Sequence, residues 1–188
     1  MEMQTGQESR LATAEAVRAC AARLINYLAA NKGDPIPSKS EIMAEIQRLL
    51  LLPNLFDAGI RRPSAHADAA CILYFDPCLM IAMAKSHKGQ DESAHNHGAW
   101  LATAVYEGEV RYRGFERLDD GNRAGHADLR IVEDRVMRSG DVALTPPPPH
   151  DIHETASLTD NIMMVVTAGN FAALRNYYDV KQKRYAVR

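Results

Sequence analysis

The sequence predicts a mainly β protein, an antiparallel sandwich or barrel that follows a set of α-helices. Two observations predict this class. The first third of the chain carries apolar residues at helical spacing, whereas the chain from Cys71 onward consists of short apolar runs separated by turn residues. No helical pattern separates these runs, and a parallel sheet would need helical crossovers between its strands. An antiparallel arrangement is therefore expected.

Two helices are expected in the N-terminal part of the chain. The first covers about residues 9–31 and has an apolar stripe that includes Cys20. The second begins at Ser38, which forms a capping box with Glu41, and it ends before Pro53. Both stripes predict packing against a core, so Cys20 is expected to be buried and unreactive.

The remaining elements are expected to be strands within a single domain. The domain is divided into a helical region at 1–65, a β-barrel at 66–178 and a C-terminal tail at 179–188. The expected strands are Cys71–Phe75, Cys78–Ser86, Ala99–Tyr106, Glu109–Leu118, Leu129–Arg138, Asp141–Thr145 and Ile162–Ala168.

Composition excludes several classes of protein. The 188 residues include 22 basic and 24 acidic side chains, a formal net charge of −2, so no nucleic-acid partner is expected. No run approaches the roughly 18 apolar residues of a membrane span, so no membrane partner is expected either. Cys20, Cys71 and Cys78 form an odd set without a CxxC pair. This usage predicts a reducing, cytoplasmic setting.

Four of the seven histidines fall into two tight groups, HNH at 95–97 and HDIH at 150–153. Side chains at positions i and i+2 of a strand point to the same face, so His95 and His97 can offer two imidazoles to one ion. A third ligand must come from another strand, and barrel topology can bring His153 to the pair. The sequence therefore predicts a metal site at these three residues. The other histidines lie in polar stretches and are expected to be solvated: His66, His87 and His126.

The residues around these histidines resemble the cupin superfamily, and within it the cysteine dioxygenase-like group of thiol dioxygenases, including 3-mercaptopropionate dioxygenase-like proteins. Bacterial members carry HxHxxW and then a strand that ends in a glycine turn; this chain has HNHGAW at 95–100 and YEGE at 106–109. A later Asp-Ile-His is matched at 151–153, and LYFDP at 73–77 is similar to the family's strand entry. The similarity covers about residues 70–178.

The resemblance implies a cupin double-stranded β-helix, or jelly-roll barrel, that holds one iron(II) through His95, His97 and His153. It further implies a mononuclear non-haem iron(II) dioxygenase. Its partners would be O2 and a small-molecule substrate, either a cysteine-like or mercaptopropionate-like thiol or a related chelating acid. The oligomeric state is left open by the sequence, with a homodimer as one possibility.

The ligand set expected here is neutral. Many cupins place a glutamate four or five residues after the second histidine, where this chain has Leu101 and Ala102. Glu107 is roughly 33 Å from His97 along a straight strand, beyond ligand reach. Three imidazoles leave the full charge on a dication, which favours anionic ligands such as a thiolate or an enolate. Ligand types alone leave nickel and zinc open beside iron.

Three further residues are candidates for the substrate pocket. Residues 169–175 resemble the segment of mercaptopropionate dioxygenases that ends in a carboxylate-binding arginine, so Arg175 is the first candidate for a substrate clamp; a surface arginine is the alternative. Trp100, the only tryptophan, either packs in the barrel or walls the pocket. His150 is a proton relay, an alternative ligand or a solvated loop residue.

The chain departs from the resembled family on its late strand. The family often carries Ser-x-His-x-Tyr beside the iron, and Met164, Val166 and Ala168 are expected at those positions. Residues 161–173 contain no His or Tyr, so the polar relay is absent in any register. An apolar wall there suits a diketone or another non-thiol substrate, which is the alternative function. A non-catalytic cupin that binds a metal or a small molecule is the third.

Overall fold

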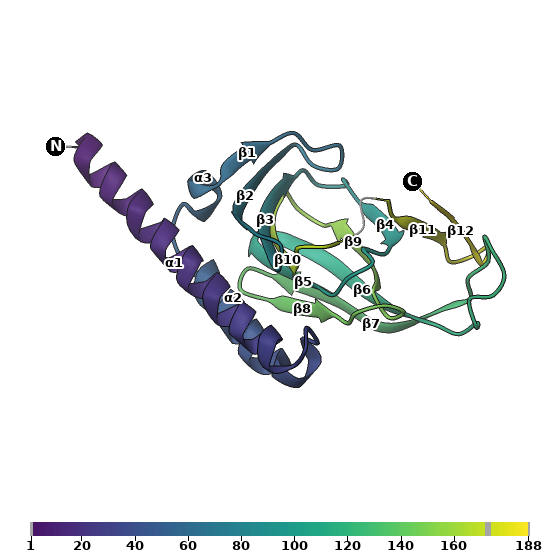
Figure 1. Ribbon diagram of the computed structural model, residues 1–188. Helices are drawn as coiled ribbons and strands as arrows, with labels where there is room; N and C mark the ends of the chain where they lie inside the picture. Colours follow the sequence, from purple (N-terminus) through teal and green to yellow (C-terminus); the bar gives the residue numbers. More distant parts are fainter. Residues whose placement is uncertain (1, 172–173, 188) are drawn as a thin grey trace.

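The computed structural model describes residues 2–171 and 174–187, and over these residues it forms a two-sheet barrel preceded by helices (Figure 1). Each sheet has six strands among the described residues, in the orders β1-β2-β3-β10-β5-β8 and β12-β11-β4-β9-β6-β7. From β3 to β10 the chain passes repeatedly between the two sheets, and the pairings are antiparallel. This winding is a double-stranded β-helix, so the predicted fold is confirmed.

The helices lie together on one side of the barrel (Figure 1). None of the described helices has the length and apolarity needed to cross a membrane. The first helix begins earlier than predicted, and its N-terminal part projects beyond the barrel. The helical elements are α1 Glu2–Ala30, the 3-10 turn η1 Ile36–Ser38, α2 Lys39–Leu50 and α3 Leu55–Ala58.

The strands include all seven predicted runs and five that were not predicted, namely β1, β4, β9, β11 and β12. The five are short, and β9 carries polar residues on its inward face, so they lack a continuous apolar run. The strands of the first sheet are β1 Ile60–Arg62, β2 Ala69–Phe75, β3 Leu79–Ser86, β10 Asn161–Ala168, β5 Leu101–Glu107 and β8 Val142–Thr145. Those of the second sheet are β12 Arg184–Val187, β11 Asn176–Asp179, β4 Glu92–His95, β9 Ile152–Ser157, β6 Glu109–Arg117 and β7 Leu129–Arg138.

The main hydrophobic core lies between the helices and the outer face of the first sheet. Leu24 of α1 and Ile46 of α2 are fully buried there. Cys20 is buried in the same cluster, as predicted. Burial also raises the pKa of the Cys20 thiol to about 11, so the thiol stays protonated and unreactive.

The side chains of β10 that face the barrel interior are not the predicted ones. Met164 and Val166, expected beside the metal, are buried in the core against the helices. The residues that face the interior of the barrel are their neighbours Met163, Val165 and Thr167. Successive strand residues alternate between the two faces of a sheet. An error of one residue in matching β10 to the resembled family therefore moves all of its predicted inward-facing residues to the other face.

Two further predictions also need revision, one about the start of the second helix and one about the C-terminal tail. The capping box at Ser38 is wrong: its side chain makes no capping bond, and its Oγ accepts a hydrogen bond from Asn31 Nδ2 at 2.8 Å. Ser38 closes the 3-10 turn η1, so its backbone lacks the extended conformation typical of an N-cap. At the other end, residues 184–187 of the expected tail form β12, which pairs with β11.

Candidate metal centre

Three buried histidines meet inside the barrel. His95 ends β4 and His153 lies near the start of β9, and the pairing of these two strands sets the residues directly opposite each other. His97 lies in the loop after β4, so the two histidines of the HNH motif do not share one strand as expected. Their exposed fractions are 0%, 3% and 7% for His95, His153 and His97. The strand pairing thus brings together the two motifs that the sequence analysis singled out.

The spacing of the three imidazoles fits one metal ion. One ring nitrogen from each residue can be chosen so that all lie within 4.8 Å of one another. The Nε2 atoms of His95 and His97 are 3.0 Å apart. Two nitrogens that each lie about 2.1 Å from one ion at a right angle are separated by about 3.0 Å. The donor type of all three residues, and the spacing of the His95–His97 pair, are those of a mononuclear site with neutral nitrogen ligands.

Backbone and carboxylate contacts orient these histidines. The Nδ1 atom of His95 lies 2.8 Å from the carbonyl oxygen of Ser93, which leaves Nε2 for a metal. The buried carboxylate of Asp151 accepts hydrogen bonds from the backbone N–H groups of His97, at 3.3 Å, and Gly98, at 2.7 Å. Asp151 therefore ties the loop that carries His97 to the start of β9.

Burial sets the charge of the cluster. Loss of solvent lowers the pKa of all three imidazoles, that of His97 to about 2. Neighbouring histidines and Arg175 lower these pKa values further, whereas the carboxylate of Glu92 opposes the effect at His95. Burial also raises the pKa of Asp151, against the N–H groups that stabilise its charged form. The imidazoles are therefore neutral, which is the form that binds a metal.

A cavity of about 200 Å³ opens beside His97 and His153. It is smaller than the roughly 300–1,000 Å³ of typical ligand pockets, so it suits a small molecule. Its mouth carries charged or titratable side chains, and much of its inner wall is apolar. The mouth residues include His66, Glu92 and Arg175, and the apolar wall includes Met80, Ala82, Ala84, Met163 and Val165.

Arg175 and Glu92 form an ion pair at this mouth. Arg175 Nη1 donates to Glu92 Oε1 at 2.9 Å, and the other carboxylate oxygen of Glu92 lies 3.8 Å from His95 Nε2. Local sequence patterns did not predict Glu92 at this site. Residues three apart in a regular strand face opposite sides, but the register of β4 shifts between Glu92 and His95 and brings both to the same site. An acidic residue shortly before the HxH motif is the signal that was available.

The two other candidate residues lie outside the lining of this cavity. Trp100 is buried in the core shared with the helices, and its carbonyl oxygen accepts a hydrogen bond from Thr167 Oγ1 at 2.6 Å. His150 is exposed and borders a separate pocket of about 300 Å³. Residues 172 and 173, within the segment that precedes Arg175, lie outside the described residues.

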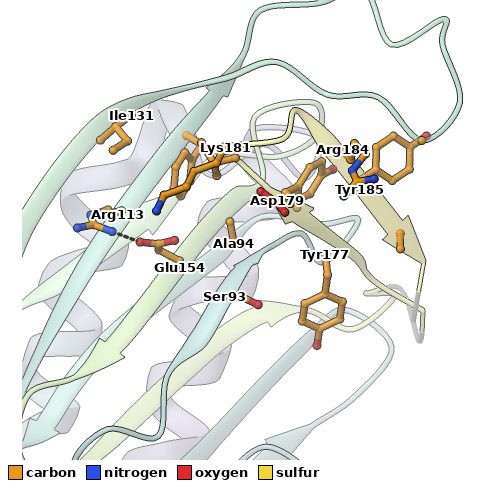
Figure 2. Close-up of a pocket in the computed structure, with 15 residues that line it drawn as sticks. Ser93, Ala94, Arg113, Ile131, Glu154, Tyr177, Asp179, Lys181, Arg184 and Tyr185 are labelled. Atoms are coloured by element: carbon orange, nitrogen blue, oxygen red, sulfur yellow. Dashed lines mark hydrogen bonds and ion pairs between the residues drawn. The ribbon is translucent and has the colours of Figure 1, made fainter.

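A larger hollow, of about 890 Å³, lies on the outer face of the second sheet (Figure 2). Ala94 lines it and points to the side of β4 opposite His95, while the Arg113–Glu154 ion pair lies at one end and the β11–β12 hairpin at the other. None of the three clustered histidines lines this hollow. The hollow of greater volume is therefore separate from the candidate metal centre.

Comparisons with known proteins concern the fold. No protein-family model and no curated protein sequence matches the chain. An RmlC-like cupin from Shewanella frigidimarina is 20% identical over 60% of this chain and 86% of its own, with a TM-score of 0.46. KdgF from Halomonas sp. is 19% identical over 61% of this chain and 91% of its own, with a TM-score of 0.45. An uncharacterised protein with a double-stranded β-helix domain from Klebsiella pneumoniae is 20% identical over 59% of this chain and 80% of its own, with a TM-score of 0.43. The function of this chain therefore rests on the geometry of its site.

Proposed function

We propose that the protein is a mononuclear non-haem iron(II) dioxygenase, similar to cysteine dioxygenases, that oxidises a small thiol or a related chelating acid with O2. The observation that carries the proposal is the cluster of three buried, neutral imidazoles beside a cavity of about 200 Å³. The cavity has an arginine at its mouth, and a cavity of this size admits only a small substrate.

In this proposal His95, His97 and His153 hold the iron. Bound iron would supply a centre at which an anionic substrate and O2 react together. The three imidazoles contribute no charge and the nearby Glu92 carboxylate is paired with Arg175, so the ligands themselves do not weaken the metal's attraction for a thiolate or an enolate. The carbonyl oxygen of Ser93 orients the imidazole of His95, and Asp151 holds the backbone at His97 in place. The apolar wall from β3 and β10 excludes water from the reacting groups.

Arg175 is proposed to bind the carboxylate of the substrate. A guanidinium can hold a carboxylate through two parallel hydrogen bonds. In the structure Glu92 occupies this role, at 2.9 Å from Arg175 Nη1. An acidic substrate would therefore have to replace the Glu92 carboxylate, and the exchange conserves the ion pair at the mouth.

A dioxygenase of a diketone or another non-thiol substrate is the second candidate. It is favoured by the apolar wall around Met163 and Val165, and by the pairing of Arg175 with Glu92, which neutralises the charge at the mouth. An enolate would bind the metal as a thiolate does, and its apolar ends would contact the alanine and methionine side chains of β3.

The deciding experiment measures metal content first and oxygen uptake second. Protein purified without added metal is compared with a His95→Ala/His97→Ala variant by elemental analysis. Near-stoichiometric iron that is lost in the variant supports the proposal, whereas zinc or nickel weakens the dioxygenase assignment. Iron-loaded protein is then mixed with cysteine, 3-mercaptopropionate or pentane-2,4-dione in an oxygen electrode. Uptake with thiols supports the first candidate, and uptake with the diketone alone supports the second. Tight metal binding without uptake points to a binding module.

A further inference from the structure

A buried hydroxyl in the metal cavity has no partner. Thr103, in the middle of β5, is 2% exposed and lines the cavity together with His97 and His153. Its Oγ1 atom is buried and makes no hydrogen bond to any described residue. Nearly all buried polar groups of native proteins are hydrogen-bonded, so an orphaned hydroxyl needs an explanation. Among the described residues the other such atoms are His153 Nδ1, in the metal cluster, and Asn161 Oδ1, at the start of β10.

The strand pattern places Thr103 deep in the cavity. Its neighbours Ala102 and Ala104 are fully buried on the helix side of the sheet, so Thr103 faces the barrel interior. Val105, the next inward-facing residue, packs in a separate buried cluster with Val110. This cluster closes the barrel beyond Thr103, whereas Arg175 lies at the opposite, open end of the cavity.

The residues paired with Thr103 offer it no polar side chain. Its partner on β10 is Val165, and its partner on β8 is Ala143. A valine at position 103 would have nearly the same shape and no unsatisfied hydroxyl, so threonine costs stability at this position. A residue that reduces stability beside a candidate metal site is accounted for most simply by a role in binding.

Thr167 shows that another buried threonine hydroxyl of the same barrel does have a hydrogen-bond partner. It lines the same cavity and is 1% exposed. Its pairing partner is Leu101, two residues before Thr103 on β5. The hydroxyl of Thr167, however, donates to the carbonyl oxygen of Trp100 at 2.6 Å. Thr167 therefore has a structural bond, while Thr103 keeps its hydrogen-bonding capacity for a ligand.

We propose that Thr103 is a specificity-determining residue whose hydroxyl hydrogen-bonds an uncharged oxygen of the ligand, a hydroxyl or a carbonyl. The charged pair of Arg175 and Glu92 lies at the mouth, and an ion at the apolar end near Val165 would be costly. The ligand class is then a small molecule with an anionic metal-binding group, a short apolar stem and a neutral oxygen at its inner end. This inference rests on the proposed function, because it describes the ligand of that same site.

The test uses pairs of probes in which a methyl group replaces the hydroxyl. One pair is 3-mercaptopropan-1-ol and butane-1-thiol, titrated into cobalt(II)-loaded protein and followed by the absorption of the thiolate complex. The other is 4-hydroxybutyrate and pentanoate, titrated by calorimetry into cobalt-loaded and metal-free protein. We expect the wild type to bind the hydroxyl-bearing member of at least one pair about tenfold more tightly. Thr103→Ser should keep this preference, and Thr103→Val should lose it.

Stability provides an independent readout that needs neither metal nor ligand. Thr103→Val should raise the Tm of the metal-free protein, because it removes an unsatisfied buried hydroxyl. The matched variant Thr167→Val should lower the Tm, because it breaks the bond to Trp100. If the wild type prefers neither member of either pair, if Thr103→Val keeps the preference, or if this variant lowers the Tm, the inference is wrong. Failure of the proposed function would instead appear as absent metal or absent oxygen uptake.

Discussion

The two sheets of the barrel divide stability and chemistry between them. The outer face of the first sheet is covered by α1 and α2 and forms the largest hydrophobic core of the described residues (Figure 1). The second sheet supplies β4 and β9, which carry two of the three clustered histidines, and its outer face carries ion pairs such as Arg111–Asp134. The first sheet mainly contributes side chains that line the wall of the cavity. Residues that hold the fold together and residues that would hold the metal are therefore largely separate sets, which can be varied independently.

Loss of a histidine ligand is the most severe test of this division. His153→Ala removes one of three donors and should abolish stoichiometric metal binding, because two protein ligands rarely hold a metal firmly. The metal-free variant should still show the circular dichroism of the folded wild type. His150→Ala is the matched control, because His150 is exposed only three residues earlier, and it should retain the metal. Elemental analysis of the two variants checks the prediction, and equal loss of metal from both would contradict it.

Shortening a side chain in the core between the helices and the first sheet should have the opposite effect: the protein should lose stability and keep its metal. Ile46 of α2 is fully buried, so Ile46→Ala should lower the free energy of unfolding by about 2–5 kcal/mol. Metal stoichiometry of the folded fraction should be unchanged. Leu51→Ala, at a side chain that is 83% exposed, should change stability by less than about 0.5 kcal/mol. Urea denaturation measures both values. Metal loss in Ile46→Ala while the protein is folded would show that the two sheets are coupled.

Asp151 lies between these extremes, because it is buried and also positions His97, one of the three candidate ligands. Asp151→Ala leaves the N–H groups of His97 and Gly98 without their acceptor and should cost about 1–3 kcal/mol of stability. It should also weaken metal binding about ten- to a hundredfold, as loss of such supporting contacts commonly does. Competition with a chelator measures the affinity. Asp151→Asn keeps an oxygen acceptor and should be milder; equal affinities for the wild type and Asp151→Ala would rule out the positioning role.

The smallest effect is expected from the ion pairs on the outer face of the second sheet. Hydrogen bonds from Arg111, and then from Arg113, hold the pKa of Asp134 at about 2. The folded pKa lies below the unfolded value of about 3.9, so the stabilisation is present above pH 4 and is lost as the pH falls through 2. The difference in Tm between wild type and Asp134→Asn should shrink over this interval and with added salt. A difference that grows toward pH 2 would refute the assignment.

The sequence by itself determined the fold class and the three clustered histidines. Helical stripes and apolar runs are local patterns, and the HNH and DIH motifs mark ligand candidates whatever their neighbours are. The short strands β4 and β9 escaped prediction, because their inward faces carry the polar residues of the site.

The tertiary structure alone decided which other side chains reach that site. The inward face of β10 depends on strand register, in which a shift of one residue exchanges Met164 and Val166 for Met163, Val165 and Thr167. Glu92 reaches His95 through a register shift within β4, and Thr103 lacks a partner because its neighbours on two other strands are apolar. Each of these features depends on residues far apart in the chain. Local sequence patterns therefore cannot reveal them, because pairing and burial are established only when the sheets assemble.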